Sequence, residues 1–293
     1  MAEQATPTFL DVPYLLEASV PRNRTSWLWY AMGAFALFVV LSSYVSGQRN
    51  KALVEGMSMV AMLGLAGAMI ATAFVAARSA QREQSELEAA EELIQLRRWD
   101  QAAALLDGML SRPARTPQSR IQGLLYLAAV LTRYHRFADA ITVYDHILET
   151  VQLDSEGSLG LRVGRAMAQL HDDRLFDADR AINELRRAPG AEESGSLALL
   201  EIYRDVKTGH PEEAADLFGR RLAAMRKQLG HRLGDAYGLA ARAQDMLGHE
   251  AEARALYEDA TLLVSEGELA RRYSELASLA GKYPAATVPG EGA

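Results

Sequence analysis

Six histidines are the side chains in this sequence best suited to metal binding or proton transfer. They occur singly, at His135, His146, His171, His210, His231 and His249. None forms the H-E-x-x-H pair that places two imidazoles and a general base on one helix face. The chain contains no cysteine, which excludes disulfides, thiolate metal sites and cysteine nucleophiles. We therefore expect no metal site built on histidine or cysteine.

Two further patterns could carry chemistry. Gly157, Gly160 and Gly164 resemble a glycine-rich loop, but no Lys and Ser/Thr follow them as a phosphate loop requires. His171 precedes Asp172 and Asp173, and this triplet suits either acid–base work or a solvated turn. Three of the histidines fall in expected turns between helices, so we favour the turn. The sequence predicts a protein that is not an enzyme and binds no cofactor.

A spacing pattern of apolar and small residues recurs along the chain and predicts helices. We call each copy of this pattern a phrase. Phe137, Ala140, Tyr144 and Ile147 follow one another at steps of three, four and three, and this spacing keeps them on one stripe of a helix. Similar phrases begin at Trp99, Leu175, Pro211 and Glu250. Their alanines, Ala102, Ala140, Ala178, Ala214 and Ala253, lie 38, 38, 36 and 39 residues apart. A period of this size predicts stacked pairs of helices that bury their apolar faces against their neighbours.

These phrases resemble the tetratricopeptide repeat (TPR) family. That family places a bulky residue at the start of the second helix of each pair, a small residue three positions later and an aromatic residue four positions after that. The resemblance covers residues 78–263 and implies an all-α solenoid of about five helix pairs. Residues 264–283 are expected to form a helix that caps the last repeat, and residues 284–293 a disordered tail.

The resemblance also implies a concave groove, lined by the first helix of each pair, that binds a peptide or a partner helix. The candidate groove residues are Tyr126, Arg133, Arg165, Tyr203, Lys207 and Arg242. Their four cations would form a basic strip suited to a peptide that carries carboxylates. The alternative that these are ordinary solvated charges stays open.

Two uncharged runs precede the repeats. After a tail over residues 1–25 that we expect to be flexible, residues 26–45 and 57–77 are long enough to cross a bilayer, with residues 46–56 as a short loop. The runs predict a two-helix transmembrane hairpin. Arginine is more frequent at its outer ends than in its loop, which favours both chain termini inside the cell.

Small residues recur at every fourth position in the second run, at Gly64, Ala68, Thr72 and Ala76. Such spacing allows two helices to pack closely in lipid, either within the hairpin or in a homo-oligomer.

The chain is acidic overall. The formal net charge is −7, which argues against nucleic acid as a partner, because nucleic acids are bound mainly through Lys and Arg. The Ala- and Arg-rich, Lys-poor composition is typical of bacterial chains. We therefore expect a scaffold or adaptor at the bacterial cytoplasmic membrane, with the repeats in the cytoplasm and an unidentified protein or peptide partner. The alternative is a non-catalytic regulatory or assembly subunit of a membrane-embedded enzyme or transport complex.

Overall fold

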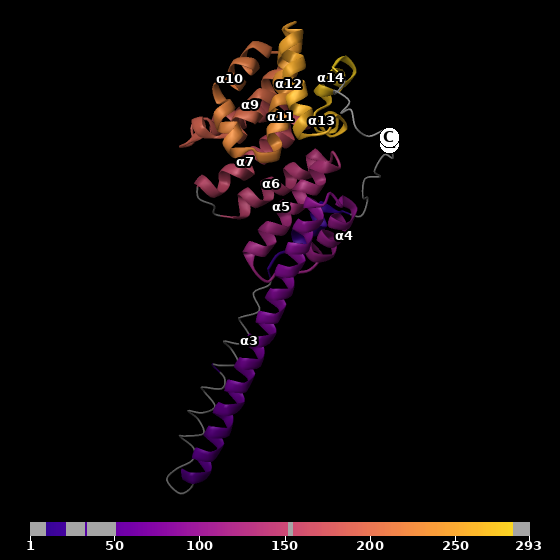
Figure 1. The fold of residues 1–293 in the computed structure, drawn as a ribbon. Helices are drawn as coiled ribbons and strands as arrows, with labels where there is room; N and C mark the ends of the chain where they lie inside the picture. The colour runs from indigo at the N-terminus through magenta and orange to yellow at the C-terminus, as the bar shows by residue number, and fades with distance from the viewer. Residues whose placement is uncertain (1–9, 22–32, 34–50, 152–154, 284–293) are drawn as a thin grey trace, which may run out of the picture. The chain divides into compact units, whose positions relative to one another are not determined.

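The computed structural model describes residues 10–21, 33, 51–151 and 155–283, and its described secondary structure is entirely helical (Figure 1). The chain divides into two compact units, Met1–Asp139 and Ala140–Ala293. The first unit contains α1 (Val12–Ala18), α3 (Lys51–Gln95), α4 (Trp99–Leu110), α5 (Pro117–Arg133) and the start of α6 (Phe137–Thr150). The second contains the remainder of α6, α7 (Ser155–His171), α8 (Leu175–Leu185), η2 (Ala191–Glu193), α9 (Gly195–Thr208), α10 (Pro211–Gln228), η3 (Gly230–Arg232), α11 (Leu233–Met246), α12 (Glu250–Leu263), α13 (Glu266–Arg272), η4 (Ser274–Leu276) and α14 (Ala277–Lys282).

The repeated phrase coincides with the second helix of each pair. Helices α4, α6, α8, α10 and α12 begin at Trp99, Phe137, Leu175, Pro211 and Glu250, the first residues of the five phrases. The five alanines of these phrases are all 0% exposed. This burial confirms their predicted position on the packed stripe of each helix, where a small side chain lets neighbouring helices approach closely.

Each pair turns through one residue in the left-handed backbone region. Arg97, His135 and Asp173 have φ values of 58°, 57° and 58°, and Gly209 and Gly248 have 80° and 79°. Every one of them lies two residues before a second helix. Glycine adopts this conformation without the steric cost that a Cβ brings, so three of the five turns use residues that adopt it less readily.

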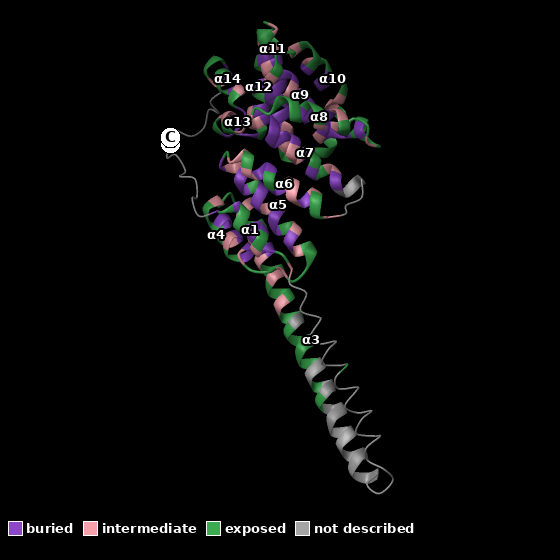
Figure 2. Ribbon diagram, turned by 180° about the vertical axis from the view of Figure 1, so that it is seen from behind, coloured by how far each residue is buried: buried purple, intermediate pink, exposed green. Residues whose placement is uncertain are grey.

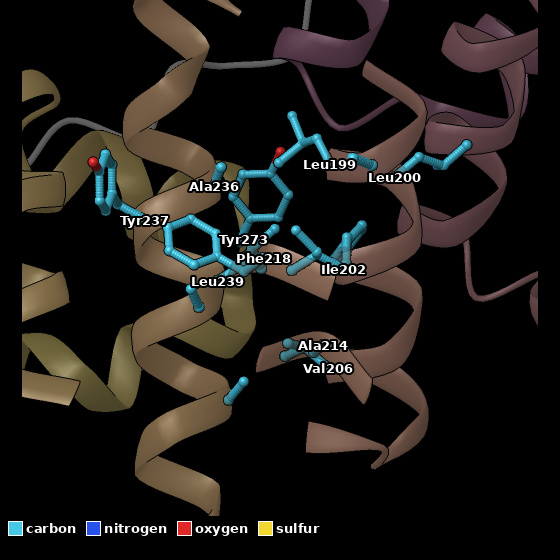
Figure 3. Packing of buried hydrophobic residues seen from close by; sticks show 14 of the residues in the cluster. Leu199, Leu200, Ile202, Val206, Ala214, Phe218, Ala236, Tyr237, Leu239 and Tyr273 are labelled. Carbon is cyan, nitrogen blue, oxygen red and sulfur yellow. The ribbon is translucent and has the colours of Figure 1, made fainter. Parts of the chain in front are cut away.

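The core of the second unit is continuous from Val163 to Tyr283. Figure 3 shows Leu199, Ile202 and Val206 of α9 packed beside Ala214 and Phe218 of α10 and beside side chains of α11. The Phe218 ring meets the Tyr237 ring edge-on, with the ring centroids 5.4 Å apart. The buried positions follow the inward faces of the helices, and the outward faces are exposed (Figure 2). This packing fixes the directions in which the polar side chains of α7, α9 and α11 point.

The first unit orders part of the segment that the sequence predicted as a flexible tail. Leu10, Val12 and Leu15 are at most 1% exposed. The Arg120 guanidinium donates to the carbonyl oxygen of Leu16 at 2.7 Å and to Ser19 Oγ at 3.0 Å, and Arg136 donates to the carbonyl oxygen of Leu10 at 2.9 Å. Helix α1 is therefore a packed element of this unit.

The predicted transmembrane hairpin is wrong. Residues 26–45 lie, apart from residue 33, outside the described residues. The second run lies in α3, a single helix of 45 residues that begins inside the predicted loop and continues into the charged segment that ends at Gln95. Among the helices that the structure describes, none has the length and apolar character needed to cross a bilayer. The prediction of a multi-pass protein of the cytoplasmic membrane, which depended on the hairpin, is therefore wrong as well.

The second run differs from an isolated span because α3 continues without a break from the uncharged run into the charged segment between Arg78 and Gln95. Ala, Gly, Ser and Thr occupy about half of positions 57–77, and such small residues favour the bilayer much less than Leu, Ile or Phe. Of the small residues proposed to pack between spans, Gly64 and Thr72 are exposed, and the side chains of Ala68 and Ala76 lie outside the described part.

Candidate functional site

Three aromatic rings meet on the inner side of the second unit. His171 ends α7, Tyr203 lies in α9, and Tyr273 lies between α13 and η4. The Tyr203 and Tyr273 rings meet edge-on at 4.9 Å between centroids, and the His171 ring lies 4.9 Å from the first and 5.4 Å from the second. Both tyrosines are 1% exposed. With Lys207 and Glu275, which contact Tyr203, these residues form what we call the inner cluster.

Polar contacts surround the Tyr203 hydroxyl. It lies 3.1 Å from His171 Nδ1 and donates to Glu275 Oε1 at 3.5 Å. The Lys207 ammonium donates to the same carboxylate at 3.2 Å and pairs with Asp173 Oδ1 at 2.8 Å. The Lys207 side chain is 13% exposed, whereas that of Asp173 is 79% exposed. The cation is thus held between one inner carboxylate and one carboxylate at the surface.

Electrostatics keep both phenols neutral. Burial, and then the charge of Glu275, raises the pKa of Tyr203 far above its ordinary value. Burial and the charge of Asp235 act in the same direction on the pKa of Tyr273. A hydrogen bond from Lys207 and its positive charge lower the pKa of Asp173. These shifts favour neutral hydroxyl groups, not the phenolate that nucleophilic or base catalysis needs.

The C-terminal segment reaches the inner cluster because its helix is interrupted. Tyr273 has an extended backbone, with φ −133° and ψ 104°, and separates α13 from η4. Asp235 of α11 pairs with Arg272, which lies 37 residues later in the chain, and Asp245 pairs with Lys282, also 37 residues later. This offset matches the repeat period, so the segment runs parallel to α11 in the position of a sixth first helix. Residues 264–283, expected to form one capping helix, contain α13, η4 and α14, with the interruption at Tyr273.

Buried polar contacts fix this segment. The Asp235 side chain is 0% exposed and accepts from Arg272 Nη1 at 2.8 Å. It also accepts from Arg232 Nε at 3.4 Å and from the Tyr273 hydroxyl at 3.5 Å. Asp245 accepts from Lys282 at 2.8 Å and from the Tyr283 hydroxyl at 3.1 Å. The segment is anchored at both ends of α11, which holds Glu275 beside Lys207.

Of the predicted groove residues in the second unit, Tyr203 and Lys207 lie together. Arg242 pairs with Asp245 at 2.7 Å, and Arg165 pairs with Asp145 of α6 at 2.7 Å. In the first unit, Tyr126 donates to Glu91 at 2.8 Å and the Arg133 guanidinium lies 5.4 Å from the centroid of the Trp99 ring. The three cations of the second unit therefore have intramolecular carboxylates. The continuous strip across both units stays a prediction.

Arg165 differs from the other candidates in helix register. Tyr203 precedes Ala214 by 11 residues and Arg242 precedes Ala253 by 11, whereas Arg165 precedes Ala178 by 13. Two residues correspond to about 200° around a helix, so Arg165 belongs to another face of its helix.

The same comparison shows a residue that the sequence interpretation missed. Lys207 and His171 both precede the repeated alanine of their own pair by 7 residues, and the structure places both against Tyr203. Aligning the repeats on their alanines would therefore have indicated that His171 occupies the position equivalent to Lys207. Glu275 had no such signal, because its position depends on the interruption at Tyr273.

Neither a known family model, nor a curated protein, nor a solved structure matches this chain. Within the described residues, moreover, no group of His, Asp or Glu side chains is arranged to hold a metal ion.

Proposed function

We propose that this protein is a non-catalytic helical-repeat scaffold, similar to TPR proteins, that binds a polypeptide segment of a partner protein at the inner cluster. The observation that carries the proposal is the environment of Lys207. This cation lies against an aromatic ring and is held in part by a carboxylate, that of Asp173, which is 79% exposed.

Such an arrangement favours exchange of carboxylates. An exposed ion pair contributes about 0–1 kcal/mol, and Asp173 regains full hydration when it leaves Lys207. A partner carboxylate that replaces it gains a charge-assisted hydrogen bond to a cation already positioned by Glu275 and Tyr203. The half-buried ring of His171 provides an adjacent aromatic surface. The partner segment we expect carries an acidic residue next to an aromatic or aliphatic one.

Selection from a random peptide library on the full chain tests this proposal. We expect acidic peptides to be enriched, and Lys207→Met to weaken them about 10- to 100-fold, the value of one hydrogen bond to a charged group. Asp173→Gly should strengthen them, because it removes the competing carboxylate and suits the left-handed backbone. Lys227→Met, at an exposed position of α10, is the matched control. If the selected peptides bind the Lys207 variant as tightly as the unaltered protein, this site is not the binding surface.

A further inference from the structure

An open trough follows α8, away from the inner cluster. It consists of two adjoining hollows with volumes of about 410 and 280 Å³. Both hollows are lined by Arg180 and Glu184; the larger is completed by Phe176, Asp179, Asn183 and Arg187, and the smaller by Arg165, Gln169, Asp177 and Ala181. The smaller hollow thus lies between α8 and the preceding helix α7. The trough shares no residue with the inner cluster.

Gln169 carries a buried amide oxygen, Oε1, that no hydrogen bond within the described residues satisfies. Its side chain is 3% exposed. A buried acceptor left in this state is costly. Gln169 lines the smaller hollow, and the terminal torsion of a glutamine side chain is soft, so rotation of the amide can present this oxygen to a ligand in that hollow. A ligand group with an N–H would satisfy it there.

The charges in the trough are balanced. Arg165 is paired with Asp145 at 2.7 Å and Arg180 with Glu184 at 3.4 Å. An acidic ligand at Arg165 or Arg180 would have to displace one of these carboxylates. A neutral group that both donates and accepts hydrogen bonds fits better, because Gln169 supplies an acceptor and the guanidinium of Arg165 supplies further N–H donors. The peptide unit of a polypeptide backbone is such a group.

The shape of the trough favours a chain segment over a small molecule. The hollows are open along α8, whereas small-molecule sites enclose most of their ligand. From Phe176 to Leu185 the helix rises about 14 Å, the length of about four residues of extended chain. The Phe176 side chain is 82% exposed and offers one large apolar contact. We propose that this trough is a second binding site, which takes an extended segment of a partner polypeptide through its backbone, with one peptide unit at Gln169 and Arg165 and one apolar side chain on Phe176.

Two simple amides test the recognition of the backbone. N-methylacetamide carries one N–H and one carbonyl, and N,N-dimethylacetamide lacks the N–H. In NMR titrations of the full chain, we expect N-methylacetamide to shift resonances of residues 165–184 at least threefold more than the dimethyl compound. Gln169→Met should abolish the difference, Gln169→Glu should keep it because the acceptor remains, and the exposed Gln101→Met is the control. Equal shifts with both amides, or a difference that survives Gln169→Met, would overturn the proposal.

A blocked pentapeptide, acetyl-Ala-Ala-Phe-Ala-Ala-amide, tests the longer contact. We expect Phe176→Ser and Gln169→Met each to lower its affinity about 3- to 10-fold, and Lys207→Met to leave it unchanged. Loss of binding only in the Lys207 variant would assign the peptide to the inner cluster and refute a site on α8. Peptide binding that neither variant affects would refute it as well.

Discussion

Replacing Asp235 with asparagine should loosen the C-terminal segment. The Asp235 carboxylate is fully buried and is the shared acceptor of Arg272, Arg232 and the Tyr273 hydroxyl. Asparagine keeps one acceptor oxygen, but it removes the charge and turns an amide N–H₂ toward guanidinium donors. The two cations are then left without the carboxylate that joins them.

The expected cost follows from burial. Removing one partner of a fully buried ion pair costs about 3–5 kcal/mol. Here the Arg232 and Arg272 side chains are 38% and 26% exposed, so water recovers part of that loss, and we expect a decrease of about 2–4 kcal/mol in the free energy of unfolding. Asp179→Asn is the matched control, because Asp179 pairs with Arg204 at 3.1 Å but is 53% exposed. It should cost about 0.5 kcal/mol or less.

Urea unfolding followed by circular dichroism measures both variants, and hydrogen exchange with mass spectrometry localises the effect. Residues 266–283 should lose protection in the Asp235 variant before the rest of the second unit does. Arg272→Met in the same chain should add less than its separate cost, since both changes remove one contact. A cost no larger than that of Asp179→Asn, or unchanged protection of residues 266–283, would refute the anchoring function assigned to Asp235.

Two further predictions concern packing and pH. Gly164→Ala should destabilise the second unit by about 1–3 kcal/mol, because its Cβ would lie 2.8 Å from Tyr144 Oη and 2.9 Å from Cζ; Tyr144→Leu in the same chain should reduce this cost, and Gly160→Ala, with open space around its Cβ, should be nearly neutral in urea unfolding. Burial of Asp245 acts to raise its pKa, but hydrogen bonds from Lys282 and Tyr283 outweigh it and lower that pKa overall. The stability from Asp245 is therefore present above its unfolded pKa of about 3.9 and lost as the pH falls through the folded pKa. Asp245→Asn should therefore make the melting temperature depend less steeply on pH between pH 5 and pH 2, and an identical slope in both proteins would contradict this.

The repeated helices were predictable because their signal is local. A step of three, four and three places a small residue and its apolar neighbours on one stripe, and the five second helices begin where these phrases begin. The hairpin was not predictable in this way, because the absence of charge from residues 57–77 does not show where the helix that contains them begins and ends. The inner cluster was predictable only in part. Tyr203 and Lys207 follow from the resemblance, but Glu275 reaches them through an interrupted helix that no periodic pattern indicates.

The turns between paired helices link the fold to the proposed binding site. Five equivalent positions adopt the left-handed backbone, but only Gly209 and Gly248 are glycines. Since Arg97, His135 and Asp173 adopt the same conformation at a cost of order 1 kcal/mol each, helix packing, and not the residue at the turn, must determine this geometry. A glycine would be less strained at position 173, but it would leave Lys207 without its surface carboxylate. The strained aspartate therefore positions an exchangeable charge at the rim of the inner cluster, where the proposed partner segment would replace it.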